Sequence, residues 1–65
     1  MDKQEAINIL DEMIEAIPKD NKDITEFWCS TEIYSVLDTK EYKQFKIYTS
    51  NLIPFDTIYG GKMYF

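Results

Sequence analysis

The sequence contains no histidine, and all seven of its basic residues are lysine. Histidine is the commonest general base near neutral pH, and arginine supplies the planar group that clamps phosphates and carboxylates. Without histidine, Cys29 and the serines lack the usual base that activates a nucleophile, and a lone cysteine cannot assemble a zinc site. Paired carboxylates could act as acid and base, but so short a chain leaves little room for a catalytic pocket. We therefore expect no enzyme activity, no catalytic residues, no cofactor and no metal ion.

The single cysteine also bears on location, because Cys29 cannot form a disulfide within the chain. It indicates a reducing compartment. The sequence has no positively charged start followed by an apolar run, so we expect no secretory signal. No apolar stretch approaches the ~20 residues that span a bilayer. The expected location is the cytoplasm, without a membrane partner.

The length of 65 residues predicts one small domain, residues 1–65. Such a chain buries only about 60% of its unfolded surface and is marginal as a monomer. Aromatic residues make up 15% of the chain and help to fill a core. Dimerisation is another common remedy for small size, so a homodimer is possible.

An amphipathic helix is predicted over residues 2–17. Six apolar residues recur at three- and four-residue steps, which places them on one stripe of a helix. Asp2 and Glu5 lie near its start, where the helix dipole favours negative charge. Pro18 ends it, because proline cannot donate to the preceding turn and disfavours helical geometry in the residue before it.

The outer face of this helix is acidic. Asp11 and Glu15 form a like-charge pair four residues apart, and Glu15 lies near the helix end that disfavours negative charge. Ile9 is predicted to project into this polar face, and no lysine stands at a compensating position along the helix. Two interpretations remain: a solvated face with one exposed isoleucine, or a partner-binding face formed by Glu5, Ile9, Asp11, Glu12 and Glu15.

Residues 18–23 form a charged linker rich in turn-forming residues, without the spacing of a calcium-binding loop. Residues 24–29 are ambiguous. Asp23 and Glu26 could cap a helix, whereas Phe27 and Trp28 favour a strand. The strand is the preferred interpretation.

Residues 31–37 and 42–49 are predicted to form a β-hairpin whose turn spans residues 38–41. Phe45, Ile47 and Thr49 alternate with polar positions, as in a half-buried strand. A short helix capped by Thr39 is the rival interpretation.

A second hairpin is predicted at the end of the sequence, with residues 55–59 and 62–65 as its strands. Gly60-Gly61 permits the positive φ angles of a tight turn, and Pro54 argues against a central strand just before it. Residues 24–65 are thus mainly β. The predicted fold class is α+β, with one N-terminal helix packed on a small antiparallel sheet of three to four short strands.

The net charge of −5 is unevenly distributed. Residues 1–38 carry ten acidic residues and three lysines, whereas residues 39–65 carry two acidic residues and four lysines. This composition does not favour direct binding to nucleic acid, which requires a basic surface. A basic surface on another protein is the better electrostatic match.

These observations favour a small acidic, non-enzymatic interaction protein that binds a basic surface of another protein and inhibits or modulates it. That partner could be a nucleic-acid-binding protein, with regularly placed carboxylates imitating nucleic-acid charge. Small acidic inhibitors of this kind are typical of viral or mobile-element accessory proteins. Two alternatives remain open: a structural subunit or homo-oligomer, suggested by aromatic strands that could pair at their edges, and a weak single-strand-binding module, suggested by late tyrosines and lysines.

Overall fold

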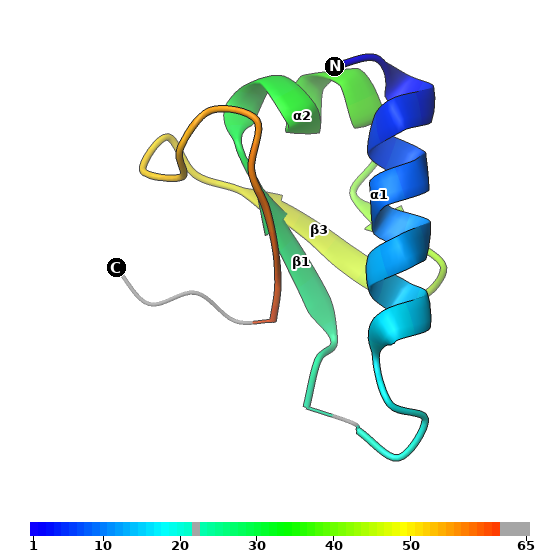
Figure 1. Cartoon of the computed structure of the whole chain (residues 1–65). Coiled ribbons are helices and arrows are strands. Elements are labelled where there is room, and N and C mark those ends of the chain that lie inside the picture. The colour runs from blue at the N-terminus through cyan, green and yellow to red at the C-terminus, as the bar shows by residue number, and fades with distance from the viewer. Residues whose placement is uncertain (22, 62–65) are drawn as a thin grey trace.

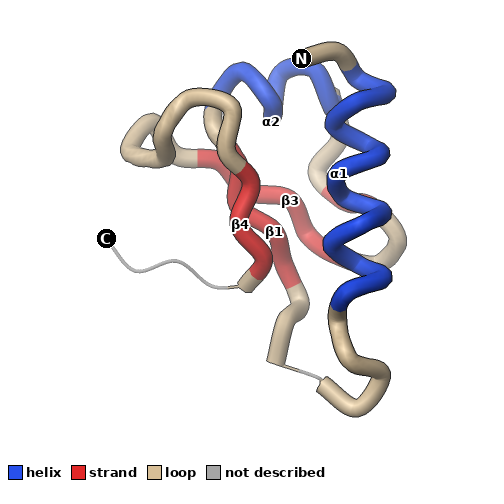
Figure 2. Tube along the Cα trace, in the orientation of Figure 1, coloured by secondary structure: helices blue, strands red, loops and turns tan. Residues whose placement is uncertain are grey.

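Two helices lie on one face of a four-stranded sheet in the computed structural model, which describes residues 1–21 and 23–61 (Figures 1 and 2). The elements are α1 (Lys3–Ala16), β1 (Glu26–Cys29), α2 (Thr31–Leu37), β2 (Glu41–Tyr42), β3 (Phe45–Thr49) and β4 (Ile58–Gly60). The strand order is β2-β3-β1-β4. The predicted α+β class is confirmed.

Helix α1 matches the prediction to within one residue at each end. The Asp2 carboxylate accepts a hydrogen bond from the Glu5 N–H at 2.8 Å, which satisfies one of the unpaired donors at the helix start. At the other end Ile17 leaves helical geometry, with ψ at 124°, immediately before Pro18. The cap and the proline therefore fix both boundaries.

The prediction of a strand over residues 31–37 is wrong, because this segment is helix α2. Ile33 and Leu37 lie four residues apart and are both fully buried, so one side of the helix faces the core. Ser30 is its N-cap, and Asp38 closes it in the left-handed conformation at φ 51°. Burial of that apolar side outweighs the strand preference of isoleucine, tyrosine and valine.

Helix α2 also changes the sheet, which is mixed and not antiparallel as predicted. Strands β1 and β3 run parallel, with Phe27 opposite Ile47. A parallel pair needs a crossover connection, and α2 lies within it. Strand β4 then adds to the other side of β1 in the antiparallel sense.

A hairpin does exist, but it joins β2 to β3 and its turn is Lys43-Gln44. Both turn residues have positive φ angles, 48° and 73°, as a type I′ turn requires. The predicted turn at residues 38–41 instead links α2 to β2. The prediction of a strand in the 42–49 region holds for Phe45–Thr49, and the rival helix is wrong.

The first strand of the second predicted hairpin is present in part as β4, at one edge of the sheet. Ile58–Gly60 pairs with β1, so that Tyr59 lies opposite Trp28. Residues 62–65, the other predicted strand, lie outside the described residues. Gly61 has φ at 101°, whereas Gly60 is the last residue of β4. Residues 24–29 do contain the preferred strand, β1.

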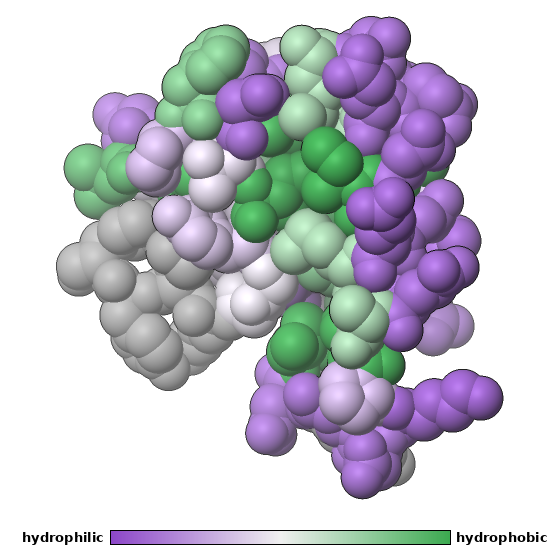
Figure 3. Space-filling model, in the orientation of Figure 1, coloured by the Kyte–Doolittle hydropathy of each residue, from purple (hydrophilic) through white to green (hydrophobic). Residues whose placement is uncertain are grey.

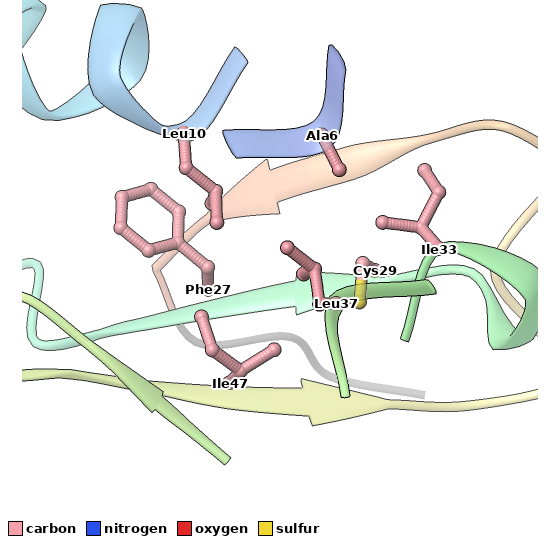
Figure 4. Packing of buried hydrophobic residues seen from close by; sticks show 7 residues of the cluster. All are labelled: Ala6, Leu10, Phe27, Cys29, Ile33, Leu37 and Ile47. Carbon is pink, nitrogen blue, oxygen red and sulfur yellow. The ribbon is translucent and has the colours of Figure 1, made fainter. Parts of the chain in front are cut away.

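The core lies between the helices and the sheet. Figure 4 shows side chains from both helices pointing toward the same face of β1 and β3. The buried cluster is Ala6, Leu10, Phe27, Cys29, Ile33, Leu37 and Ile47. Because Ala6 and Leu10 hold the inner side of α1 in this core, the acidic residues of the helix face outward.

Candidate functional site

The five residues predicted to bind a partner divide into two groups on α1. Glu5, Glu12 and Glu15 are exposed, whereas Ile9 and Asp11 are half-buried. On a helix, residues three or four positions apart are neighbours, so Glu5, Ile9 and Glu12 form one continuous patch. Asp11 lies toward the other side of the helix, where it contacts the β2–β3 hairpin.

Asp11 is bound within the fold. Its carboxylate lies 2.8 Å from the Lys43 ammonium and accepts a hydrogen bond from the Tyr42 hydroxyl, also at 2.8 Å. The ammonium lies 5.5 Å from the centre of the Tyr42 ring. The hydrogen bond to Lys43, and to a smaller extent that to Tyr42, lowers the pKa of Asp11. The same two hydrogen bonds raise the pKa values of Lys43 and Tyr42. Asp11 therefore attaches the hairpin to α1.

Glu15 lies on the same side of the helix, four positions after Asp11. Its negative charge adds to that of Asp11 in raising the pKa of Lys43. The compensating lysine that α1 lacks along its own length is thus supplied by the turn of the β2–β3 hairpin. This side of α1, formed by Asp11 and Glu15 with Lys43 and Tyr42, is called the hairpin side below.

The opposite side of α1 is formed by Glu5, Ile9 and Glu12, and is called the open side below. Within residues 1–21 and 23–61 the single ion pair is that of Asp11 with Lys43. Glu5 and Glu12 are thus exposed carboxylates without a cationic partner among those residues. Ile9 is half-buried beside them, in contrast to its predicted position in the middle of the acidic face.

An apolar groove continues the open side toward the C-terminal end of α1. Its volume is about 250 Å³. It is lined by Met13 and Ala16 of α1, by Ile17, Pro18 and Ile24 of the segment that follows, and by Phe27 and Gly60 of the sheet. Figure 3 shows hydrophobic surface along this edge of α1, directly beside the hydrophilic outer face. Ile9 lies one helical turn before Met13, so it extends the same apolar row.

This groove is not evident from the sequence, because its walls come from distant segments. Gly60 is the decisive residue. A Cβ atom placed there would lie 3.2 Å from the Phe27 ring and 3.6 Å from the Met13 methyl. Glycine at this position leaves the space open, and a side chain would fill it. The glycine itself is the signal that the sequence offers, although Gly60-Gly61 is equally typical of a turn.

The single thiol belongs to the core. Cys29 is 1% exposed, and its sulfur donates to the Tyr48 carbonyl oxygen at 3.5 Å. Burial, with a smaller contribution from the charge of Glu32, raises its pKa to about 11. A thiol in this state is a weak nucleophile at neutral pH.

The face of the sheet opposite the helices carries several of the aromatic residues. Trp28 and Tyr48 stack there with ring centres 5.1 Å apart, and Tyr59 lies opposite Trp28 in the sheet register. Trp28 donates to the Glu26 carboxylate at 2.5 Å. By strand alternation, this face carries the charges of Glu26, Glu41 and Lys46. A face with two carboxylates and one ammonium group does not suit the negatively charged phosphates of nucleic acid.

Two apolar side chains are displayed by the loop between β3 and β4. Phe55 is 77% exposed and Leu52 is 66% exposed, while Ile53 between them is buried. The loop is held by local bonds, including one from the Leu52 N–H to the Ser50 hydroxyl at 3.1 Å. The Asp56 N–H also donates to the Glu32 carboxylate at 2.5 Å. These hydrogen bonds hold the loop in the conformation that exposes Leu52 and Phe55.

No protein-family model, curated protein or solved structure matches this chain. In the part of the chain that the structure describes, neither helix is long and apolar enough to cross a membrane.

Proposed function

We propose that this protein is a small, non-enzymatic interaction protein that binds a basic surface of another protein through the outer face of α1 and thereby inhibits or modulates it. One observation carries this proposal. Glu5 and Glu12 are exposed on α1 and have no cationic partner among the described residues, whereas Asp11 of the same helix is paired.

The physical basis is electrostatic complementarity with an apolar contact beside it. Two exposed carboxylates and a net charge of −5 attract a basic partner and speed its encounter with the helix. Ile9, half-buried beside Glu5 and Glu12, supplies apolar surface that is dehydrated when the partner docks. Glu15 lies at the margin of this contact, because its charge also interacts with Lys43 on the hairpin side.

The proposed partner is a protein that itself binds nucleic acid. Its basic surface is built to meet regularly spaced negative charge, and carboxylates on a helix can occupy that surface in place of phosphates. Such a competitor needs no chemistry of its own, which is the action of a viral or mobile-element inhibitor. The buried, unpaired thiol of Cys29 fits a reducing compartment, so we place the protein in the cytoplasm.

The test compares Glu12→Lys with Glu41→Lys. Each changes the net charge from −5 to −3, but Glu41 lies on β2, at the sheet edge opposite β4. Immobilised protein is mixed with extract of the source organism, and captured proteins are quantified by mass spectrometry. We expect Glu12→Lys to lose basic proteins that Glu41→Lys retains, and excess duplex DNA to displace them. Equal capture by both folded variants would disprove the proposal.

A role in assembly is the second candidate, and the β3–β4 loop favours it. Phe55 and Leu52 form an exposed apolar pair of the kind that often marks a protein interface. A homo-oligomer held by this pair predicts sedimentation that changes with concentration in the wild type and not in Phe55→Ser. A monomer at all concentrations would exclude this candidate.

A further inference from the structure

We infer that the apolar groove at the end of α1 receives one large apolar side chain of the partner, so that the bound segment is basic and carries an apolar anchor residue. This inference rests on the proposed function and specifies the partner further. The groove of Met13, Ala16, Ile24, Phe27 and Gly60 adjoins the open side of α1 and would be occupied in the same docking event.

The size of the groove argues for a side chain as its occupant. Its volume of about 250 Å³ lies below the roughly 300–1,000 Å³ typical of small-molecule sites. Its lining is almost entirely apolar, with no charged residue. A free metabolite would find few polar groups to orient it. A leucine or phenylalanine side chain needs no polar group in the groove, since the backbone of that residue remains outside.

Charge complementarity identifies the rest of the segment. Glu12 lies four residues before Ala16, which lines the groove, and Ile9 lies three residues before Glu12. A segment seated in the groove by one side chain therefore passes directly over exposed carboxylates. A lysine or arginine residue within one helical turn of the anchor meets Glu12, and a basic residue about two turns further along meets Glu5; neither glutamate has a cationic partner among the described residues.

Two synthetic peptides test the inference. Both are lysine–alanine peptides of equal length and charge, and one carries a single central leucine where the other has alanine. Binding is followed through the backbone amide NMR signals of the ¹⁵N-labelled full chain. We expect the leucine peptide to bind at least about tenfold more tightly, and to shift the amides of Met13, Ala16 and Gly60. Equal affinity of the two peptides, or no shift at the groove, would overturn the inference.

Ala16→Leu fills the groove from the exposed end of α1 without entering the buried cluster. We expect this variant to bind the two peptides with equal affinity. That affinity should be the one with which the wild type binds the alanine peptide. Gln4→Leu adds the same side chain at an exposed position in the first turn, and should behave as the wild type. If Ala16→Leu retains the advantage of the leucine peptide, the groove is not the anchor site.

The design separates this inference from the proposed function. Glu12→Lys should weaken both peptides to a similar degree, because it removes the charge contact and leaves the groove. If Glu12→Lys and added salt affect neither peptide while leucine still improves binding, the charge-based function fails and the groove stands. If the groove amides shift with protein concentration alone, a second copy occupies the groove and the inference is overturned.

Discussion

The two sides of α1 carry the same kind of residue in opposite situations. On the hairpin side, Asp11 is bonded to both Lys43 and Tyr42, and its charge is used to hold the fold together. On the open side, Glu5 and Glu12 form no ion pair within residues 1–21 and 23–61, and Glu12 lies one helical turn before Ala16 of the apolar groove. The difference teaches that acidity along a helix does not by itself indicate function, since tertiary neighbours decide which carboxylates remain available.

The largest effect is expected from reversing charges on each side in turn. Glu5→Lys/Glu12→Lys should weaken binding to the basic partner, or to the lysine peptides, by roughly tenfold or more, because attraction becomes repulsion. Its thermal unfolding should remain near that of the wild type. Isothermal titration and circular dichroism measure the two properties on the same samples.

The matched control is Asp11→Lys/Glu15→Lys, which changes the net charge equally. It places lysines beside Lys43, so it should lower the unfolding temperature and weaken binding less. If both double variants lose affinity equally while remaining folded, the two sides of α1 are not functionally different.

The hairpin side can be strengthened through its turn. Gln44 has φ at 73°, a conformation that glycine adopts without the steric cost paid by other residues. Gln44→Gly should raise the free energy of unfolding by about 1 kcal/mol, as measured by urea denaturation. Peptide binding at the open side should be unchanged. A less stable variant would show that the Gln44 side chain contributes more than its backbone conformation costs.

A smaller effect is expected from separating the Asp11–Lys43 pair, because the side chains are 36% and 58% exposed, respectively, and solvent screens them. Asp11→Asn and Lys43→Met should each lower the urea midpoint slightly. Their combination should cost less than the sum of the single changes, since either change alone already removes the pair. Strict additivity would mean that the contact does not stabilise the fold.

The same pair predicts a modest dependence of stability on pH. The pKa of Asp11 is lower in the folded chain than its ordinary value of 3.8. The contribution of ionised Asp11 to the free energy of unfolding is therefore fully present above that value. It is lost as the pH falls through the lower pKa of the folded chain. Asp11→Asn should reduce the loss of stability measured by urea denaturation in this acidic range. Some slope remains from Glu32, whose pKa is lowered by the Ser30 hydroxyl and the Asp56 N–H.

Features that depend on local sequence were predictable. Helix α1 is predictable because Asp2 and Glu5 lie near its start, Pro18 follows it and its apolar residues recur regularly. Strand β3 was found because Ile47 and its neighbours alternate. The exposed positions of Glu5 and Glu12 followed from the same helical period. Each of these inferences needs only residues within one element.

Features that depend on distant partners were missed. Helix α2 has a strand-like composition, and only the core shows which of its sides is buried. The Lys43-Gln44 turn lacks the glycine or asparagine that usually signals a type I′ turn. For the site, the state of Asp11 depends on Tyr42, 31 positions away. Nothing in the local sequence of α1 could separate Asp11 from Glu12.

The central position of β1 has a consequence for how the chain folds. Both neighbours of this strand, β3 and β4, come later in the sequence. During synthesis on the ribosome, β1 therefore emerges with two unpaired edges, and α1 has no completed sheet to cover. Non-local strand pairing of this kind slows folding and exposes strand edges to association with other chains. Cotranslational aggregation should thus be greatest before Phe45–Thr49 has emerged to pair with β1.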